Sequence, residues 1–407
     1  GGSNVAIGRA ALDANTTGAS NVAVGAYALD ANTTASYNTA VGQASLGATT
    51  TGASNTALGW QTLLANTTAS NNTAVGYAAL TANTTSEYNV AVGSSALYAN
   101  TTGTRNIAVG HACLDACTIG RYNVAMGYAA LSNDVVGDYS TALGYQALEN
   151  QVSDSDNQAV RNTAVGSHAG DGLTTATRCV LIGSHAGGGA TFTGDVNIAI
   201  GVEALYSATS AANNICIGYQ AGYVTTAIVD GAQNICIGNA SKTSATDSTY
   251  QTVLGYNVAG NADNSLCFGS GTTDSAIAYG ATSITAPSDV RLKEDIQDEV
   301  VGLDFINALR PVTFRWKKEK DVPEDMVAHK ADSEERVMDG KYNHGFIAQE
   351  VKEVIDQHPD IKDGFDMWSE DDADGRQRIG EGALIPMLTK AVQELSAEVE
   401  KLKKEQN

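Results

Sequence analysis

Proline is missing from residues 1–286 of this 407-residue chain, and all five prolines lie between Pro287 and Pro386. Charged residues are scarce over the same stretch. Residues 1–287 hold 6 Lys+Arg and 16 Asp+Glu, whereas residues 288–407 hold 18 and 29. Both scarcities end near Pro287. They indicate a boundary between two structural units, in a chain that is too long for one ordinary core.

Basic clusters and long apolar runs are also lacking. The formal net charge of −21 predicts that nucleic acid is not a partner, and no apolar run approaches the length of a membrane span, so no membrane partner is expected. The six cysteines show no close zinc-type pairing beyond Cys113 and Cys117, and we interpret them as small buried hydrophobes. We predict no cofactor and no metal.

Internal repeats dominate what is present. The motif Asn-Val-Ala-Ile-Gly begins at Asn4, and its copies recur every 17 residues as far as Ser140. Less regular copies begin at Asn162, Cys179, Asn197, Asn214, Asn234 and Gln251. The chain starts inside a repeat and without methionine, so we interpret it as a fragment of a longer protein.

Each repeat position has a physical interpretation. The second position is β-branched and the fourth is aliphatic; the two share one face of a strand, and we expect the fourth to be buried in nearly every copy. The third position, almost always Ala, faces the opposite way, where only a small side chain fits. The fifth is always Gly, which predicts a corner with positive φ or a close backbone approach. The ninth is Leu, which predicts a second inward segment.

The competing structures are a helix and a β-solenoid. Glycine in every copy and the rows of Thr and Asn argue against helix. We therefore predict a mainly β protein: a parallel β-solenoid with one coil per 17 residues over residues 1–270, a linker or shaft end over 271–287, and a small α/β domain over 288–407. A thin coil with a core of Ala, Val and Leu buries little apolar surface, which favours assembly into a homotrimer.

Two rows of side chains recur in register. His168 and His185 share one repeat position, where a metal site is an alternative to a stacked or solvated ladder. Tyr37, Tyr88, Tyr122 and Tyr139 share the last repeat position. These tyrosines are interpreted either as a packing ladder, which we favour, or as a row that binds glycan. We see no carboxylate pair that would identify a glycosidase.

The last 120 residues change character. Residues 302–309 read as a helix, residues 312–316 as a strand, and residues 342–351 as a strand that runs into a helix. Apolar residues near the end are spaced alternately three and four apart: Ile385, Leu388, Val392, Leu395, Val399 and Leu402. That spacing predicts a coiled coil over residues 385–404.

Both parts resemble known families. The repeat resembles the head coils of trimeric autotransporter adhesins and the shafts of marine phage tail fibres. Residues 288–407 resemble the peptidase S74 intramolecular chaperone domain at the C-termini of phage endosialidases and tail fibres. The second resemblance rests on Ser-Asp-x-Arg-Leu-Lys at 288–293, Gly-Phe-Ile-Ala-Gln-Glu-Val at 345–351, and the terminal coiled coil.

The resemblance implies a domain that trimerises, guides the folding of the fibre before it, and then cleaves itself off. Ser288 would be the nucleophile and Lys293 the general base, and the Pro287–Ser288 bond would be cut once, with no external substrate. A serine hydroxyl needs a nearby base to become nucleophilic, and lysine serves when its pKa is lowered. The alternative is that Ser288 begins a turn and Lys293 is a surface cation.

The sequence therefore predicts a phage tail fibre or tail spike shaft for host attachment, made in the host cytoplasm and located in the virion tail. Its expected partners are two further copies of the chain, other tail proteins bound through a missing N-terminal part, and a host surface receptor, either glycan or protein. Two alternatives remain: a tail spike that degrades polysaccharide, and a trimeric cell-surface adhesin. The soluble C-terminal coiled coil disfavours the adhesin, and the regular shaft leaves little room for a second catalytic domain.

Overall fold

The computed structural model describes residues 2–406 apart from residues 154, 156, 157, 190, 224–226, 272, 282, 283, 285–287, 289, 327, 339, 362–366 and 371–376. The chain divides into two compact units, Gly1–Ser288 and Asp289–Asn407. We call the first unit the shaft. The second is the C-terminal unit.

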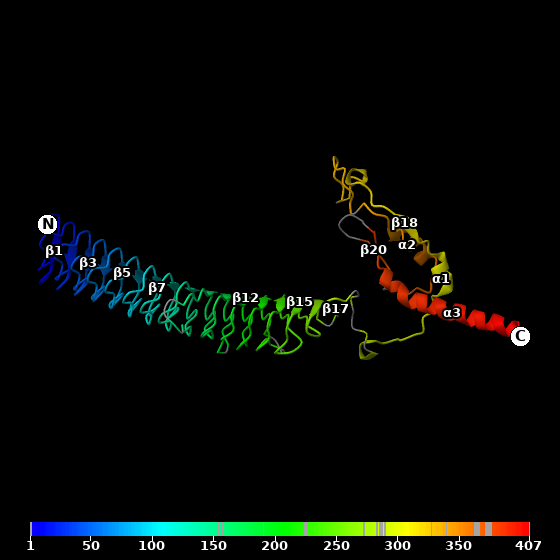
Figure 1. Ribbon diagram of the computed structural model, residues 1–407, viewed down its shortest axis with the longest axis horizontal. Coiled ribbons are helices and arrows are strands. Elements are labelled where there is room, and N and C mark those ends of the chain that lie inside the picture. Colours follow the sequence, from blue (N-terminus) through cyan, green and yellow to red (C-terminus); the bar gives the residue numbers. More distant parts are fainter. Residues whose placement is uncertain are drawn as a thin grey trace. The chain divides into compact units, whose positions relative to one another are not determined.

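The shaft is a parallel β-solenoid, as predicted, in which each coil contributes one short strand and successive strands stack along the shaft (Figure 1). The first fourteen strands are β1 (Val5–Ile7), β2 (Val22–Val24), β3 (Thr39–Val41), β4 (Thr56–Leu58), β5 (Thr73–Val75), β6 (Val90–Val92), β7 (Ile107–Val109), β8 (Val124–Met126), β9 (Thr141–Leu143), β10 (Thr163–Val165), β11 (Val180–Ile182), β12 (Ile198–Ile200), β13 (Ile215–Ile217) and β14 (Ile235–Ile237). Three longer strands follow: β15 (Gln251–Tyr256), β16 (Ser265–Ser270) and β17 (Thr273–Ala278).

All neighbouring strands from β1 to β16 pair parallel and in register, so that each repeat position lies above its equivalent. The final pair, β16 and β17, is antiparallel. The turn into an antiparallel strand ends the solenoid, because the chain reverses instead of completing another coil.

The core of each coil is narrow. The third-position alanines, such as Ala40 and Ala74, are fully buried, and so are the ninth-position leucines, such as Leu46 and Leu80. These leucines adopt φ between 50° and 57°. A left-handed conformation costs about 1–2 kcal/mol per residue, whereas burying a leucine side chain contributes about 1.5–3 kcal/mol. Burial therefore holds the leucines in a conformation that they would otherwise avoid.

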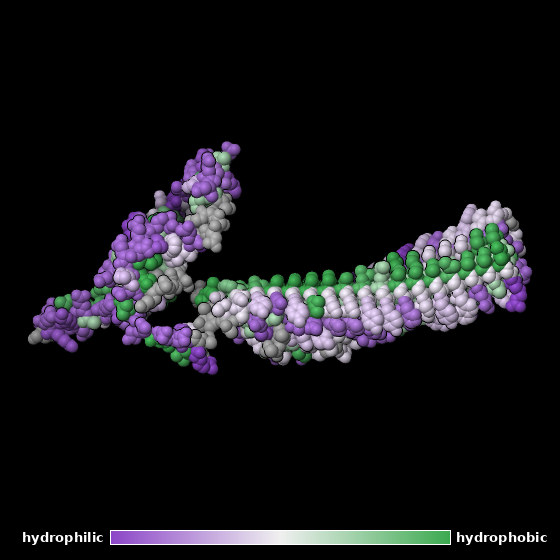
Figure 2. All heavy atoms as spheres, turned by 180° about the vertical axis from the view of Figure 1, so that it is seen from behind, coloured by the Kyte–Doolittle hydropathy of each residue, from purple (hydrophilic) through white to green (hydrophobic). Residues whose placement is uncertain are grey.

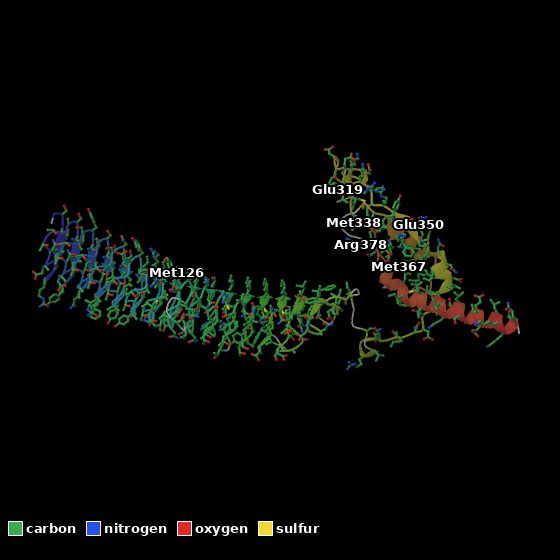
Figure 3. All side chains as sticks on the ribbon, viewed as in Figure 1. Met126, Glu319, Met338, Glu350, Met367 and Arg378 are labelled. Atoms are coloured by element: carbon green, nitrogen blue, oxygen red, sulfur yellow. The ribbon has the colours of Figure 1, made fainter. Side chains whose placement is uncertain are left out.

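The prediction that the fourth position is buried in nearly every copy is wrong for the single chain. Ile7, Leu58 and Met126 are 60%, 47% and 45% exposed, and the others are half-buried or exposed. Because strand side chains alternate, the inward third position turns the second and fourth positions outward. Together they form the strand-face rows, the apolar stripes along the shaft in Figure 2, where Met126 of Figure 3 also lies.

The first-position asparagines form a buried ladder that connects consecutive coils. Asn55 donates its backbone N–H to the Asn38 Oδ1 atom (2.9 Å), and the Asn72 N–H donates to Asn55 Oδ1 (3.0 Å). The Asn55 Nδ2 group donates to the Ala69 carbonyl at 2.9 Å. One amide thus satisfies backbone groups at two places in the core, where an unpaired group would cost about 1–3 kcal/mol.

The fifth-position glycine forms the corner that the sequence predicts. Its φ lies between +128° and +144° from Gly8 to Gly269. A Cβ atom placed on Gly76 would stand 2.4 Å from the Gly93 carbonyl oxygen of the next coil. Both the dihedral angle and the close stacking of coils therefore require glycine.

The sequence also predicts buried cysteines in the shaft and rows of tyrosine and histidine side chains along it. All six cysteines are buried and free, and burial raises the pKa of Cys113 and Cys117 to about 12, as expected of inert core thiols. Tyr122 stacks on Tyr139, and His168 stacks on His185 at 4.7 Å. These rings form packing ladders.

In the C-terminal unit the structure confirms the helix, the strand and the strand–helix pair that the sequence predicts. The elements are η1 (Val290–Leu292), α1 (Leu303–Ala308), β18 (Val312–Phe314), η2 (Glu319–Asp321), β19 (Asn343–Gly345), α2 (Ala348–Asp356), β20 (Trp368–Glu370), β21 (Gln377–Ile379), η3 (Glu381–Ala383) and α3 (Leu384–Glu405). Two antiparallel pairs form, β18 with β19 and β20 with β21.

We predict that Gly76→Ala destabilises the shaft, because the added methyl group meets the neighbouring backbone and φ is unsuitable. The expected loss is about 2–3 kcal/mol, measured as a lower denaturation midpoint at a fixed heating rate. Gly47→Ala is the matched control. Position ten carries side chains in other copies, such as Asp30 and Leu64, so this control should keep the wild-type midpoint. Equal midpoints for the two variants would contradict the prediction.

Candidate functional site

The C-terminal unit has a small hydrophobic core between its helices. Phe305 of α1, Val351 of α2 and Leu384 of α3 meet there with Met367, which is fully buried (Figure 3). The edge of the Phe305 ring contacts His358, with ring centroids 5.2 Å apart. The sequence placed Phe305 and Val351 on helices, but their convergence with Leu384 and Met367 depends on tertiary packing, including that of α1 on α3.

The start of α1 is capped from far away in the sequence. Glu394 of α3 accepts a hydrogen bond at 2.8 Å from the backbone N–H of Leu303. Gly302, the residue before the helix, has no side chain that could serve as a cap. A carboxylate at a helix N-terminus satisfies an otherwise unpaired donor and interacts favourably with the helix dipole, so the long C-terminal helix determines where α1 begins.

Charged side chains fix the edges of the unit. The Arg310 Nε atom donates to Glu350 Oε2 at 2.9 Å (Glu350 is labelled in Figure 3), and this contact lowers the pKa of the Glu350 carboxyl group. Lys318 and Lys320 both contact Glu334 and lower its pKa to about 2. These groups are exposed, so we ascribe to them orientation of the segments more than stability.

The predicted catalytic residues lie on either side of the boundary between the two units. Ser288 is the last residue of the shaft and is exposed. Lys293 follows η1, donates its backbone N–H to the Val290 carbonyl at 3.2 Å, and is also exposed. Pro287, on the other side of the predicted cleavage site, lies outside the described residues.

Exposure matters for the chemistry of the pair. Lysine becomes a general base when burial or neighbouring cations lower its pKa. The Lys293 side chain is exposed, so burial is not met in the single chain. The dyad Ser288–Lys293 therefore stays a prediction from the sequence.

Helix α3 carries an uncovered apolar stripe along most of its length. Leu384, Met387 and Ala391 face the unit's own core. On the other side, the residues with alternating three- and four-residue spacing are 43–66% exposed: Ile385, Leu388, Val392, Leu395, Val399 and Leu402. The helix is therefore confirmed, whereas its coiled-coil pairing stays a prediction.

One feature of the unit was not anticipated from the sequence. A shallow depression of about 390 Å³ opens beside the β18–β19 pair, with His344, Phe346 and Glu381 in its lining. His344 immediately precedes the Gly-Phe-Ile-Ala-Gln-Glu-Val motif, but Glu381 is distant in sequence, and only folding brings the two side chains to one place.

The described residues contain no group of three or more His, Cys, Asp or Glu side chains arranged to hold a metal ion. In that part of the chain, none of the helices has the length and apolar character that crossing a bilayer requires.

Comparison with known proteins identifies one domain. Residues 288–359 match the family model of the peptidase S74 domain, described as the chaperone of endosialidase. The match begins at Ser288 and includes Lys293 and the strand–helix motif, and it ends before α3. Neither the curated proteins nor the solved structures contain a significant match to the chain.

Proposed function

We propose that this chain is the shaft of a homotrimeric phage tail fibre or tail spike used for host attachment, folded by its own C-terminal unit. The observation that carries the proposal is the position of the chaperone-of-endosialidase domain, which starts at residue 288, immediately after a long parallel β-solenoid. A domain of this kind at the end of a fibre acts on the chain that precedes it.

The physical need for such a chaperone follows from the shaft itself. Its first fourteen strands are three residues long, and the repeats that carry them are similar in sequence. Pairing with the wrong coil therefore preserves most contacts, while a slip of one residue reverses the facing of every side chain. Parallel, non-local pairing is also intrinsically slow. A unit that holds several chains in register at one end removes this ambiguity.

Two uncovered apolar surfaces support assembly with further copies of the chain. The strand-face rows expose apolar residues along the shaft, including Ile7, Ile107 and Ile237. The stripe on α3 exposes apolar residues on the C-terminal unit. Soluble monomers rarely expose continuous apolar patches larger than a few hundred Å², so each surface is suited to contact with the same surface on another copy.

The number of copies is argued from the domain family and not from the helix alone. The stripe on α3 has Ile or Val at every other position and Leu between them, a pattern that favours two strands in an isolated coiled coil. Here, however, each helix also packs against α1 of its own unit. That second contact restricts how closely the α3 helices of different copies approach one another, and the resemblance to trimeric fibre proteins favours three copies.

Self-cleavage belongs to the same proposal. Lys293 Nζ takes the proton of the Ser288 hydroxyl, and Oγ attacks the carbonyl carbon of Pro287. The Pro287–Ser288 C–N bond breaks, the Ser288 nitrogen gains a proton as an amine, and the resulting ester is hydrolysed by water. The covalent connection places the bond beside the nucleophile. In the assembled fibre, a neighbouring copy would supply the burial that lets a lysine act as a general base.

The experiment that tests the chaperone role is synthesis of residues 1–287 alone. We expect misfolded or aggregated shaft, because nothing then sets the register between chains. The same segment produced by removal of the C-terminal unit after folding should remain a soluble trimer. For each preparation, light scattering gives the assembly mass, and the amount of soluble protein gives the yield. A soluble trimer from residues 1–287 alone, with the yield of the full chain, would refute the role.

For assembly, we predict that Leu395→Glu disrupts the trimer, because the substitution places a charge in the apolar stripe of α3. Light scattering should report three chain masses for the wild type, and monomer or aggregate for the variant. Gln393→Glu adds the same charge to an exposed position of the same helix and should leave the trimer intact. A wild-type dimer, or a Leu395→Glu protein that assembles normally, contradicts the proposal.

For cleavage, we predict that the wild-type chain releases a fragment of about 120 residues, visible by denaturing electrophoresis. Ser288→Ala should abolish release because it removes the nucleophile. This variant and the Lys293→Arg variant should both still trimerise. Lys293→Arg keeps the positive charge but removes the base, since arginine does not lose its proton in proteins; it too should remain at full length. Normal cleavage by Lys293→Arg would exclude Lys293 as the base.

A further inference from the structure

Positive charge on the shaft is concentrated on one edge. Residues 1–287 contain six Lys and Arg side chains. Arg105, Arg161 and Arg178 share the last repeat position, and Arg121 comes one position earlier, next to Tyr122. All four are exposed. In a unit with more than twice as many acids as bases, four of six cations therefore lie on the same edge within a few coils.

Exposed tyrosines share the last repeat position with three of these arginines. The Arg105 guanidinium lies between two rings, 5.5 Å from the centroid of Tyr88 and 5.4 Å from that of Tyr122. Tyr122 stacks on Tyr139 at 4.9 Å with an interplanar angle of 3°, and the Arg161 guanidinium lies 5.8 Å from the Tyr139 ring. We call this set the arginine–tyrosine row; it consists of Tyr88, Arg105, Tyr122, Tyr139, Arg161 and Arg178.

The stacking determines which atoms the row offers to a partner. Ring faces are covered by the neighbours along the row, so a sugar cannot stack on them as on an isolated aromatic residue. The edges remain exposed and carry phenol hydroxyls and guanidinium N–H groups. Arg105 Nη1 donates to the Tyr122 hydroxyl oxygen at 3.1 Å, which leaves further donors of the five that a guanidinium carries. Such donors bind carboxylates strongly and with defined geometry.

Acidic side chains on the same edge are engaged with the backbone. Asp138 Oδ1 accepts the Arg121 backbone N–H at 2.7 Å. Asp195 Oδ1 accepts the Thr177 N–H at 2.7 Å and the Thr177 hydroxyl at 3.0 Å. Glu87 and Asp263 share their repeat position, and Asp263 Oδ1 accepts the Thr249 N–H at 2.9 Å. The ion pairs found among the described residues lie in the C-terminal unit.

We propose that the arginine–tyrosine row binds an acidic polysaccharide, with sugar carboxylates on the guanidinium groups and sugar hydroxyls on the tyrosine hydroxyls. The inference rests on the proposed attachment function and names the chemistry of its receptor. Arg105 and Arg161 are three coils apart, about 14 Å at the usual spacing of strands. Two tyrosine hydroxyls lie between these two arginines, whereas Arg161 and Arg178 occupy successive coils. A row that combines cations with hydroxyl groups suits a polymer of mixed charge and hydroxyl groups. Nucleic acid, with its dense phosphates, fits them poorly on a shaft of net negative charge.

The test measures binding of the full chain to polygalacturonate, a homopolymer of uronic acid, in buffer with EDTA. Neutral dextran and single-stranded DNA serve as comparison polymers. Arg161→Gln/Arg178→Gln removes two charges from the row. Arg9→Gln/Lys242→Gln removes two charges from the same shaft outside the row. We expect the first variant to weaken polygalacturonate binding at least about tenfold and the second to change it less than about twofold.

Three results would overturn the proposal. The first is wild-type binding to dextran or DNA that equals or exceeds binding to polygalacturonate, including no binding to any of the three polymers. The second is equal weakening of binding by both double variants, which would indicate that only the overall charge matters. The third is a changed assembly mass for Arg161→Gln/Arg178→Gln by light scattering, which would place the row in a contact between chains. The chaperone, trimer and cleavage experiments above keep all the shaft arginines in place, so they test the proposed function separately from this inference.

Discussion

The stacking of identical coils in register is the constraint on which the rest of the shaft depends. A spacing of one strand per coil lets the Asn55 side chain bond two backbone groups in the core, the Asn72 N–H and the Ala69 carbonyl, and it brings Gly76 so close to Gly93 that no Cβ fits. The same spacing places leucines above leucines, and their burial holds the positive φ. Asparagine, glycine and leucine therefore recur for three separate reasons that share one cause.

The narrowness of the core explains why the shaft presents so much apolar surface. Alanine is the usual inward strand residue, so the larger aliphatic side chains at positions two and four are left outside. In a single chain this arrangement is unfavourable, because apolar side chains face water. It becomes favourable when copies of the chain cover one another. On this interpretation assembly completes a core that one coil is too thin to build.

The C-terminal unit has the opposite organisation. It is rich in charge, its apolar core is small, and its longest helix serves two surfaces: Met387 and Ala391 face inward, while Val392 and Leu395 face outward. Glu394 on the same helix caps α1. Under the proposed function, one helix both closes its own unit and carries the stripe for assembly, so the folding of the unit and the alignment of several chains would be coupled. Such coupling suits a device that sets register before the shaft forms.

The sequence alone determined the solenoid, the 17-residue coil, the glycine corner and the helices of the C-terminal unit, because periodicity and glycine placement are local signals. It also supplied Ser288 and Lys293, through their motif. It did not determine which strand face is inward, since alternation fixes only that positions two and four oppose position three. Tertiary structure decided that question, because the third-position side chain, alanine in most coils, is the one that the narrow core accommodates. It also decided the capping of α1 by Glu394, the presence of His344 and Glu381 in the lining of one depression, and the position of the Arg105 guanidinium between two tyrosines, since each depends on how the chain packs.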